Sequence, residues 1–110
     1  AVSPDASEMV VSVCLREWCG SGGLDAWSPN ARTVLFRSMD GGRTWAPAHD
    51  GLPPHFHNNL TTHLVAASRT RSGVFAFHDD SDGIFITTDA AATWRQLPIL
   101  VPDAWGLVVT

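Results

Sequence analysis

Three histidines close together are the first side chains in this 110-residue chain that could do chemistry. His55, His57 and His63 fall within one polar stretch. Imidazole nitrogens are ligands that zinc and nickel accept, so the three together could hold such an ion. The ordinary alternative is a surface loop whose histidines form local hydrogen bonds, and the spacing alone does not decide between the two.

An acidic cluster offers a second possible metal site. Asp79, Asp80 and Asp82 lie between two apolar segments, and their carboxylate oxygens could contact calcium. The cluster is short and lacks the distal carboxylate that completes a calcium loop. The ordinary alternative is a hairpin turn that ends on Gly83.

Aromatic and basic side chains near a glycine-rich stretch could form a binding pocket. Trp27 could stack on the face of a sugar, with Arg16 and Trp18 beside it, and Trp105 is a further aromatic candidate. The ordinary alternative is that Trp27 covers a small core of its own loop.

The composition excludes several function classes. Seven arginines, no lysine and eleven carboxylates give a net charge of −4, which argues against nucleic acid as a partner. No apolar run approaches the roughly 20 residues that span a membrane. Cys14 and Cys19 lack the second ligand pair of a structural zinc site, and they could equally form a local disulfide or remain two free thiols. No cofactor is indicated.

An internal repeat organises the chain. Residues 34–45 read VLFRSMDGGRTW and residues 83–94 read GIFITTDAAATW, so that matching positions lie 49 residues apart. A period near 50 is typical of propellers and other repeat arrays.

The elements that must position these residues are short strands. Segments rich in β-branched and aromatic residues are bounded by glycine, aspartate, asparagine or proline, while no stretch has helical periodicity over three turns. We therefore predict an all-β chain. The expected strands are Met9–Leu15, Val34–Ser38, His63–Ser68, Val74–His78, Ile84–Thr88 and Gly106–Thr110.

The repeated segment resembles the Asp-box, also known as the bacterial neuraminidase repeat. The first copy matches every defining position and the second is degenerate, with threonine for serine and alanine for glycine. The matching residues are Ser38, Asp40, Gly42, Thr44 and Trp45, then Thr87, Asp89, Ala91, Thr93 and Trp94.

The resemblance implies a structural hairpin between the third and fourth strands of a propeller blade. The aspartate is expected to accept hydrogen bonds from its own turn, and Thr44 to join them. Gly42 suits a left-handed backbone, whereas Ala91 would cost about 1 kcal/mol there, so the second turn is expected to be looser or differently shaped. Trp45 and Trp94 are expected to bury their rings between adjacent sheets.

The resemblance also implies an organisation for residues 1–110 as one unit of two propeller repeats, approximately 9–52 and 60–98. Residues 103–110 would then be the first strand of a following blade. Because propellers need about 4–8 blades, the ring would be completed by oligomerisation, with three chains giving six blades, or by a longer chain.

The expected function is a non-catalytic module for binding or assembly. A self-contained sialidase is excluded, because tyrosine and an Arg-Ile-Pro motif are absent. The alternatives are a fragment of a larger secreted Asp-box glycoside hydrolase and a carbohydrate-binding lectin ring. The expected partners are further blades or other copies of the chain, with a glycan or protein ligand, in an extracellular or periplasmic location.

Overall fold

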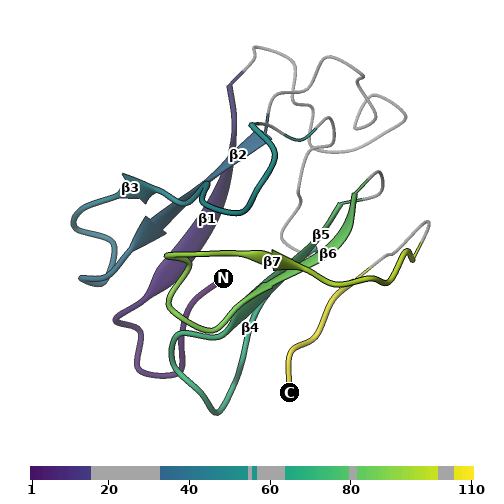
Figure 1. The fold of residues 1–110 in the computed structure, drawn as a ribbon. Helices are drawn as coiled ribbons and strands as arrows, with labels where there is room; N and C mark the ends of the chain where they lie inside the picture. Colours follow the sequence, from purple (N-terminus) through teal and green to yellow (C-terminus); the bar gives the residue numbers. More distant parts are fainter. Residues whose placement is uncertain (16–32, 55, 57–63, 80–81, 102–105) are drawn as a thin grey trace.

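A computed structural model describes residues 1–15, 33–54, 56, 64–79, 82–101 and 106–110, and within them the chain forms seven short strands (Figure 1). Among these residues no helix occurs, which confirms the all-β prediction, and accordingly none that could span a membrane. The strands are β1 (Met9–Cys14), β2 (Thr33–Ser38), β3 (Ala46–Pro47), β4 (Val65–Ala67), β5 (Phe75–Asp79), β6 (Gly83–Thr87) and β7 (Arg95–Gln96).

The strands form two antiparallel sheets, which we name sheet A and sheet B. Sheet A has the order β1-β2-β3, and sheet B has the order β4-β5-β6-β7. Figure 1 shows them as two separate layers, with sheet A on the left of the view. Within the described residues both sheets are open, so neither closes on itself.

The two sheets have the same register at their repeated strands. In sheet A, Phe36 pairs with Pro47, and in sheet B the residues 49 positions later, Phe85 and Gln96, pair in the same way. The next hydrogen bond also repeats, from Ala48 N to the Leu35 carbonyl and from Leu97 N to the Ile84 carbonyl. The sequence repeat is therefore a repeat of strand geometry.

The first strand of sheet B has a short counterpart in sheet A. β4 pairs with β5, and Ala1–Val2 lie at the corresponding edge of β1, where Val10 N donates to the Ala1 carbonyl and Val2 forms an antiparallel bridge with Met9. The sequence pattern did not indicate this edge, because two residues are too few to show alternation.

The C-terminal segment differs from its expected form. Gly106–Thr110 was predicted to be a strand, but it forms none, and Val109 makes an isolated parallel bridge with Ser68 beside β4. The predicted alternation is weak over five residues, and a short segment without a partner on both sides gains few ladder hydrogen bonds.

The hydrophobic core lies between the two sheets. Phe77 is the centre of an aromatic cluster: its ring stacks on Phe85 at 4.9 Å and meets Phe56 and Trp94 edge to face at 5.0 and 5.1 Å. Sheet A contributes smaller side chains to the same core, namely Val10, Leu35 and Ala48. Large rings on one sheet thus pack against small aliphatic groups on the other.

Candidate functional site

The turn after β2 is held by one carboxylate. Asp40 Oδ1 accepts hydrogen bonds from Arg43 N at 3.0 Å and Thr44 N at 2.9 Å, and Asp40 Oδ2 accepts one from the Thr44 hydroxyl at 2.6 Å. The Ser38 hydroxyl donates to Asp40 Oδ1 and accepts from Gly42 N. Both carboxylate oxygens are therefore engaged within the turn.

The turn after β6 repeats this arrangement. Asp89 accepts hydrogen bonds from Thr93 N at 2.9 Å, from the Thr93 hydroxyl at 2.6 Å and from the Thr87 hydroxyl at 2.7 Å, while Ala91 N donates to Thr87 Oγ1. The expectation of a looser second turn was wrong, since Ala90 and Ala91 take φ values of 58° and 61°. The hydrogen bonds to Asp89 and Thr87 hold these alanines in a backbone region that alanine rarely adopts.

The hydrogen bonds favour the ionised form of both aspartates. The Thr44 hydroxyl and N–H, followed by the Ser38 hydroxyl, lower the pKa of Asp40 to about 2. The Thr93 and Thr87 groups do the same for Asp89, whose pKa is also about 2. A carboxylate with a low pKa whose oxygens accept turn hydrogen bonds is suited to capping the backbone and is a poor proton donor at neutral pH.

A third turn of this kind, around Asp5, was not predicted from the sequence. Asp5 accepts hydrogen bonds from the Ser3 hydroxyl at 2.6 Å and the Ser7 hydroxyl at 2.9 Å, which, with the Ser7 N–H, lower its pKa to about 2. The signal was the Ser-x-Asp spacing of Ser3 and Asp5, the same as in Ser38 and Asp40. It was missed because the rest of the motif is absent.

Trp94 lies where the segment after β3 comes into direct contact with the turn of sheet B. It is 5 % exposed, and its backbone N–H donates a hydrogen bond of 2.8 Å to the Asp50 carbonyl in the segment after β3. Gly51 follows with a φ of +83°, and a Cβ at that position would lie 2.1 Å from the Trp94 carbonyl oxygen. On the same side of the interface, the Arg37 guanidinium donates to the Ala90 carbonyl at 3.2 Å.

Trp45, the counterpart of Trp94 in sheet A, is not buried. The expectation that both rings lie between sheets was wrong for Trp45, which is 42 % exposed and donates through Nε1 to the Gly42 carbonyl. The physical reason is its position: Trp94 faces sheet A, whereas no described strand covers the corresponding side of sheet A.

Trp45 belongs to an apolar surface on the outer side of sheet A. Val10 and Leu35 point into the core, so the side chains that alternate with them point outward. Met9 and Trp45 both approach Gly42, which places them on that side. We name this surface the Trp45 face; it comprises Met9, Val11, Val13, Val34, Phe36, Trp45 and Pro47.

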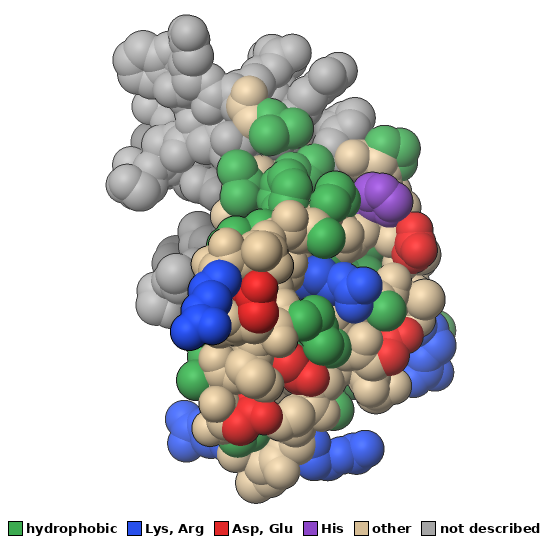
Figure 2. Space-filling view, turned by 90° about the vertical axis from the view of Figure 1, so that its left-hand side faces the viewer, with side chains coloured by type: hydrophobic (Ala, Val, Ile, Leu, Met, Phe, Trp, Pro, Cys, Tyr) green, Lys and Arg blue, Asp and Glu red, His purple; other side chains and the backbone are tan. Residues whose placement is uncertain are grey.

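The Trp45 face is accessible over much of its area. Trp45 and Val13 are exposed, and Val11, Val34 and Phe36 are partly buried. Figure 2 looks at the molecule from the side of sheet A and shows hydrophobic side chains gathered in the upper part of this face. A contiguous apolar surface of this kind marks an interaction site in soluble proteins.

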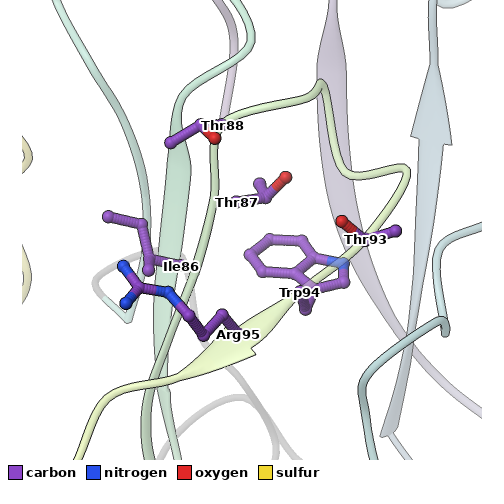
Figure 3. A pocket seen from close by; sticks show the side chains of 6 residues that line it. All are labelled: Ile86, Thr87, Thr88, Thr93, Trp94 and Arg95. Atoms are coloured by element: carbon purple, nitrogen blue, oxygen red, sulfur yellow. The ribbon is translucent and has the colours of Figure 1, made fainter.

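A small open pocket lies beside the second turn. Its volume is about 220 Å³, and Figure 3 shows Arg95 next to Ile86 and the Trp94 ring between Thr87 and Thr93. Thr87 and Thr93 donate their hydroxyls to Asp89, so their hydrogens are not free for a ligand. Thr88 and Arg95 supply the exposed polar groups of the lining.

Most of the ligand candidates fall outside the described residues. This holds for the proposed binding pocket, the histidine group and both cysteine side chains; the residues are Arg16, Trp18, Trp27, Trp105, His55, His57, His63 and Asp80, with Cys19 and the side chain of Cys14.

Two members of the acidic cluster are described. Asp79 is buried at the end of β5, and its Oδ2 accepts a hydrogen bond of 3.0 Å from Asp82 N, as in an ordinary hairpin turn. Across the described part of the chain, no group of three or more His, Cys, Asp or Glu side chains is arranged to hold a metal ion.

Comparison of the sequence with known proteins gave no match. No known protein family matches the sequence. No curated protein matches it either.

Proposed function

We propose that this chain is a non-catalytic β-propeller module of the Asp-box type, whose role is assembly through the Trp45 face. The observation that carries the proposal is the contrast between two equivalent tryptophans. Trp94 is buried against a neighbouring sheet, while Trp45, 49 positions earlier, is 42 % exposed. A sheet packed on the Trp45 face would give Trp45 the environment that Trp94 already has.

The energetics favour such a contact. Burying a large aromatic ring and the aliphatic groups around it contributes roughly 25 cal/mol per Å² of apolar surface removed from water. The Trp45 face combines one tryptophan, one phenylalanine, one methionine, one proline and three valines. The interface between sheets A and B shows that such surfaces pack well in this fold, because Phe77, Phe85 and Trp94 form a continuous aromatic core there.

The role of the turn aspartates supports a structural function. Asp40 and Asp89 are the carboxylates that a hydrolase interpretation would choose first. Their oxygens accept hydrogen bonds from Thr44 and Thr93 within the turns. The two carboxylates of a glycoside hydrolase act on one substrate, whereas each oxygen of Asp40 and Asp89 accepts a hydrogen bond within its own turn.

The solution mass tests the proposal. Light scattering coupled to size exclusion should give a mass above the 11.9 kDa of one chain, rising with protein concentration. W45E should return the mass to 11.9 kDa, because a charge on the Trp45 face cannot be buried without a large desolvation cost.

The matched control is V108E, which places the same charge at an exposed apolar residue outside the Trp45 face and should associate like the wild type. A wild-type chain that stays at 11.9 kDa at all concentrations would contradict the proposal. So would a W45E variant that associates unchanged, or turnover of glycoside substrates by the wild-type chain.

A further inference from the structure

We infer that the partner of the Trp45 face is a second copy of this chain, which presents the outer side of its sheet B in a head-to-tail arrangement. This inference rests on the proposed function and adds the identity and orientation of the partner. It follows from the interface between sheets A and B, which shows which two kinds of face this repeat packs together.

The internal interface joins two unlike faces. Sheet B contributes large rings, with Phe85 and Trp94 pointing toward sheet A. Sheet A contributes small aliphatic side chains, with Leu35 and Ala48 pointing toward sheet B. Rings on one side and aliphatic groups on the other are therefore the combination that packs in this molecule.

The Trp45 face carries aromatic rings, like the side of sheet B that packs in the internal interface. Phe36 lies 49 positions before Phe85, and Trp45 lies 49 positions before Trp94. Both pairs have equivalent strand register, since Phe36 pairs with Pro47 and Phe85 with Gln96. The outer side of sheet A therefore carries aromatic rings at the same positions as the inner side of sheet B.

The outer side of sheet B carries aliphatic side chains, like the side of sheet A that packs in the internal interface. Ile84 lies 49 positions after Leu35, and Leu97 lies 49 positions after Ala48. Leu97 N donates to the Ile84 carbonyl at 2.8 Å, as Ala48 N does to the Leu35 carbonyl at 3.0 Å. We name this surface the Ile84 face; it comprises Ala66, Ala76, Ile84, Ile86 and Leu97, with the exposed Arg95 beside Ile86. Ala76 and the neighbouring His78 are buried within the chain, whereas Ala66, Ile84, Ile86 and Leu97 are partly exposed.

An exposed apolar segment extends the Ile84 face. Ile99 and Leu100 are 52 % and 67 % exposed, and the Val101 carbonyl lies 2.6 Å from Nε2 of His78. Asp50 and Gly51, the residues 49 positions before Ile99 and Leu100, contact Trp94 in the internal interface.

The backbone of this segment departs from the repeat. Gly51 has a φ of +83° and Leu100 does not have a positive φ, so the close backbone approach at Gly51 is not repeated. Contact with Trp45 of a second copy is therefore made by the Ile99 and Leu100 side chains.

The two faces lie on different sheets of one chain, which fixes the kind of association. Packing the Trp45 face of one copy on the Ile84 face of the next is heterologous, so a pair of copies still has one free Trp45 face, on one copy, and one free Ile84 face, on the other. Such contacts generate a closed ring or an open stack. An isologous dimer, by contrast, would pack two Trp45 faces and place rings against rings.

A mixing experiment with two variants tests the inference. W45E blocks the Trp45 face and L100E blocks the segment beside the Ile84 face, and each variant retains the other face. We expect each variant alone to have the mass of one chain, 11.9 kDa, by light scattering. Mixed in equal amounts, they should form a dimer of twice that mass and nothing larger, because both outer faces of the mixed dimer are blocked.

The possible results separate this inference from the proposed function. If L100E alone associates like the wild type while W45E does not, the Trp45 face pairs with itself, and the head-to-tail inference is overturned while the proposed function stands. If both variants and their mixture stay at one chain, the inference is also overturned. If W45E associates like the wild type, both the proposed function and the head-to-tail inference are wrong. The milder variants W45Q and L100Q, checked by circular dichroism, guard against loss of folding.

Discussion

Each of the three turn aspartates stabilises its turn through a charged carboxylate that accepts several short hydrogen bonds. Asp40 and Asp89 accept both a backbone N–H and a hydroxyl from the residue four positions later, Thr44 and Thr93. Hydrogen bonds to a charged group are stronger than neutral ones, and protonation would remove an acceptor. The contribution of these residues to stability therefore depends on pH.

The direction of that dependence follows from the two pKa values. Folding lowers the pKa of Asp40 and of Asp89 from the ordinary value of 3.8 to about 2. The stabilisation is therefore complete above about pH 4 and is lost as the pH falls toward 2. We expect the free energy of unfolding, measured with urea, to fall over this range for the wild type and to fall less for D40N/D89N.

Two details sharpen this measurement. Asp5, whose pKa is also about 2, remains in the double variant and should preserve part of the slope. D50N is the matched control, because the Asp50 carboxylate contacts the exposed ring of His49 and caps no turn. Equal slopes for wild type and D40N/D89N would show that the two turn carboxylates do not couple folding to pH.

At the scale of the strands and sheets, backbone atoms make a close contact between the two halves of the molecule. Gly51 brings the segment after β3 next to Trp94, where Trp94 N donates to the Asp50 carbonyl. A Cβ at Gly51 would lie 2.1 Å from the Trp94 carbonyl oxygen, a distance at which either segment must move. Glycine is required there both for its φ of +83° and for the absence of a side chain.

This geometry predicts unequal effects for two glycine substitutions. G41A adds a methyl at a φ of +70°, 3.6 Å from the Ala6 carbonyl oxygen and therefore without a clash, so we expect a loss of about 1 kcal/mol in the free energy of unfolding. G51A adds the same strain together with a clash that separates the sheets, so we expect a loss of about 2–4 kcal/mol. Denaturant unfolding of the two variants measures the difference, and similar losses would mean that the sheets separate at little cost.

The repeat explains how much of this arrangement could be predicted from sequence. The motif around Asp40 is local, so its residues indicate both the turn and the strands beside it, and β2 and β6 were predicted to within one residue at each end. The exposure of Trp45 could not be predicted, because the sequence shows the same motif at Trp94 and does not show which side of each sheet is covered. Burial depends on neighbouring sheets and so on contacts distant in the sequence.

The second turn shows a different limit. Gly41 and Gly42 indicate a left-handed backbone, whereas Ala90 and Ala91 argue against one. The structure keeps the same backbone in both turns, since Thr87 and Asp89 make the hydrogen bonds that their counterparts make in the first. Side-chain hydrogen bonds here outweigh a local preference of about 1 kcal/mol per residue.

At the scale of the whole molecule, the exposed apolar residues mark the two ends of a stack of sheets. Trp45 lies at the sheet A end, and Ile99 and Leu100 lie at the sheet B end. The internal interface between the ends is well packed, with Phe77 at its centre. A repeat that buries its inner faces and leaves apolar side chains exposed at its two ends gains further stability with each added sheet, as in other repeat arrays.

This organisation predicts that stability depends on protein concentration. Association stabilises the folded state by mass action, and each tenfold increase above the Kd adds up to about 1.4 kcal/mol per interface. In a chain of this size that corresponds to an increase in Tm of roughly 5 °C. We expect calorimetry to show such an increase for the wild type and for V108E. W45E and L100E should each have a constant Tm, because neither variant can associate with copies of itself. A wild-type Tm that is independent of concentration, together with a mass of one chain, would place the stabilising partner of the Trp45 face outside this chain and contradict assembly from copies.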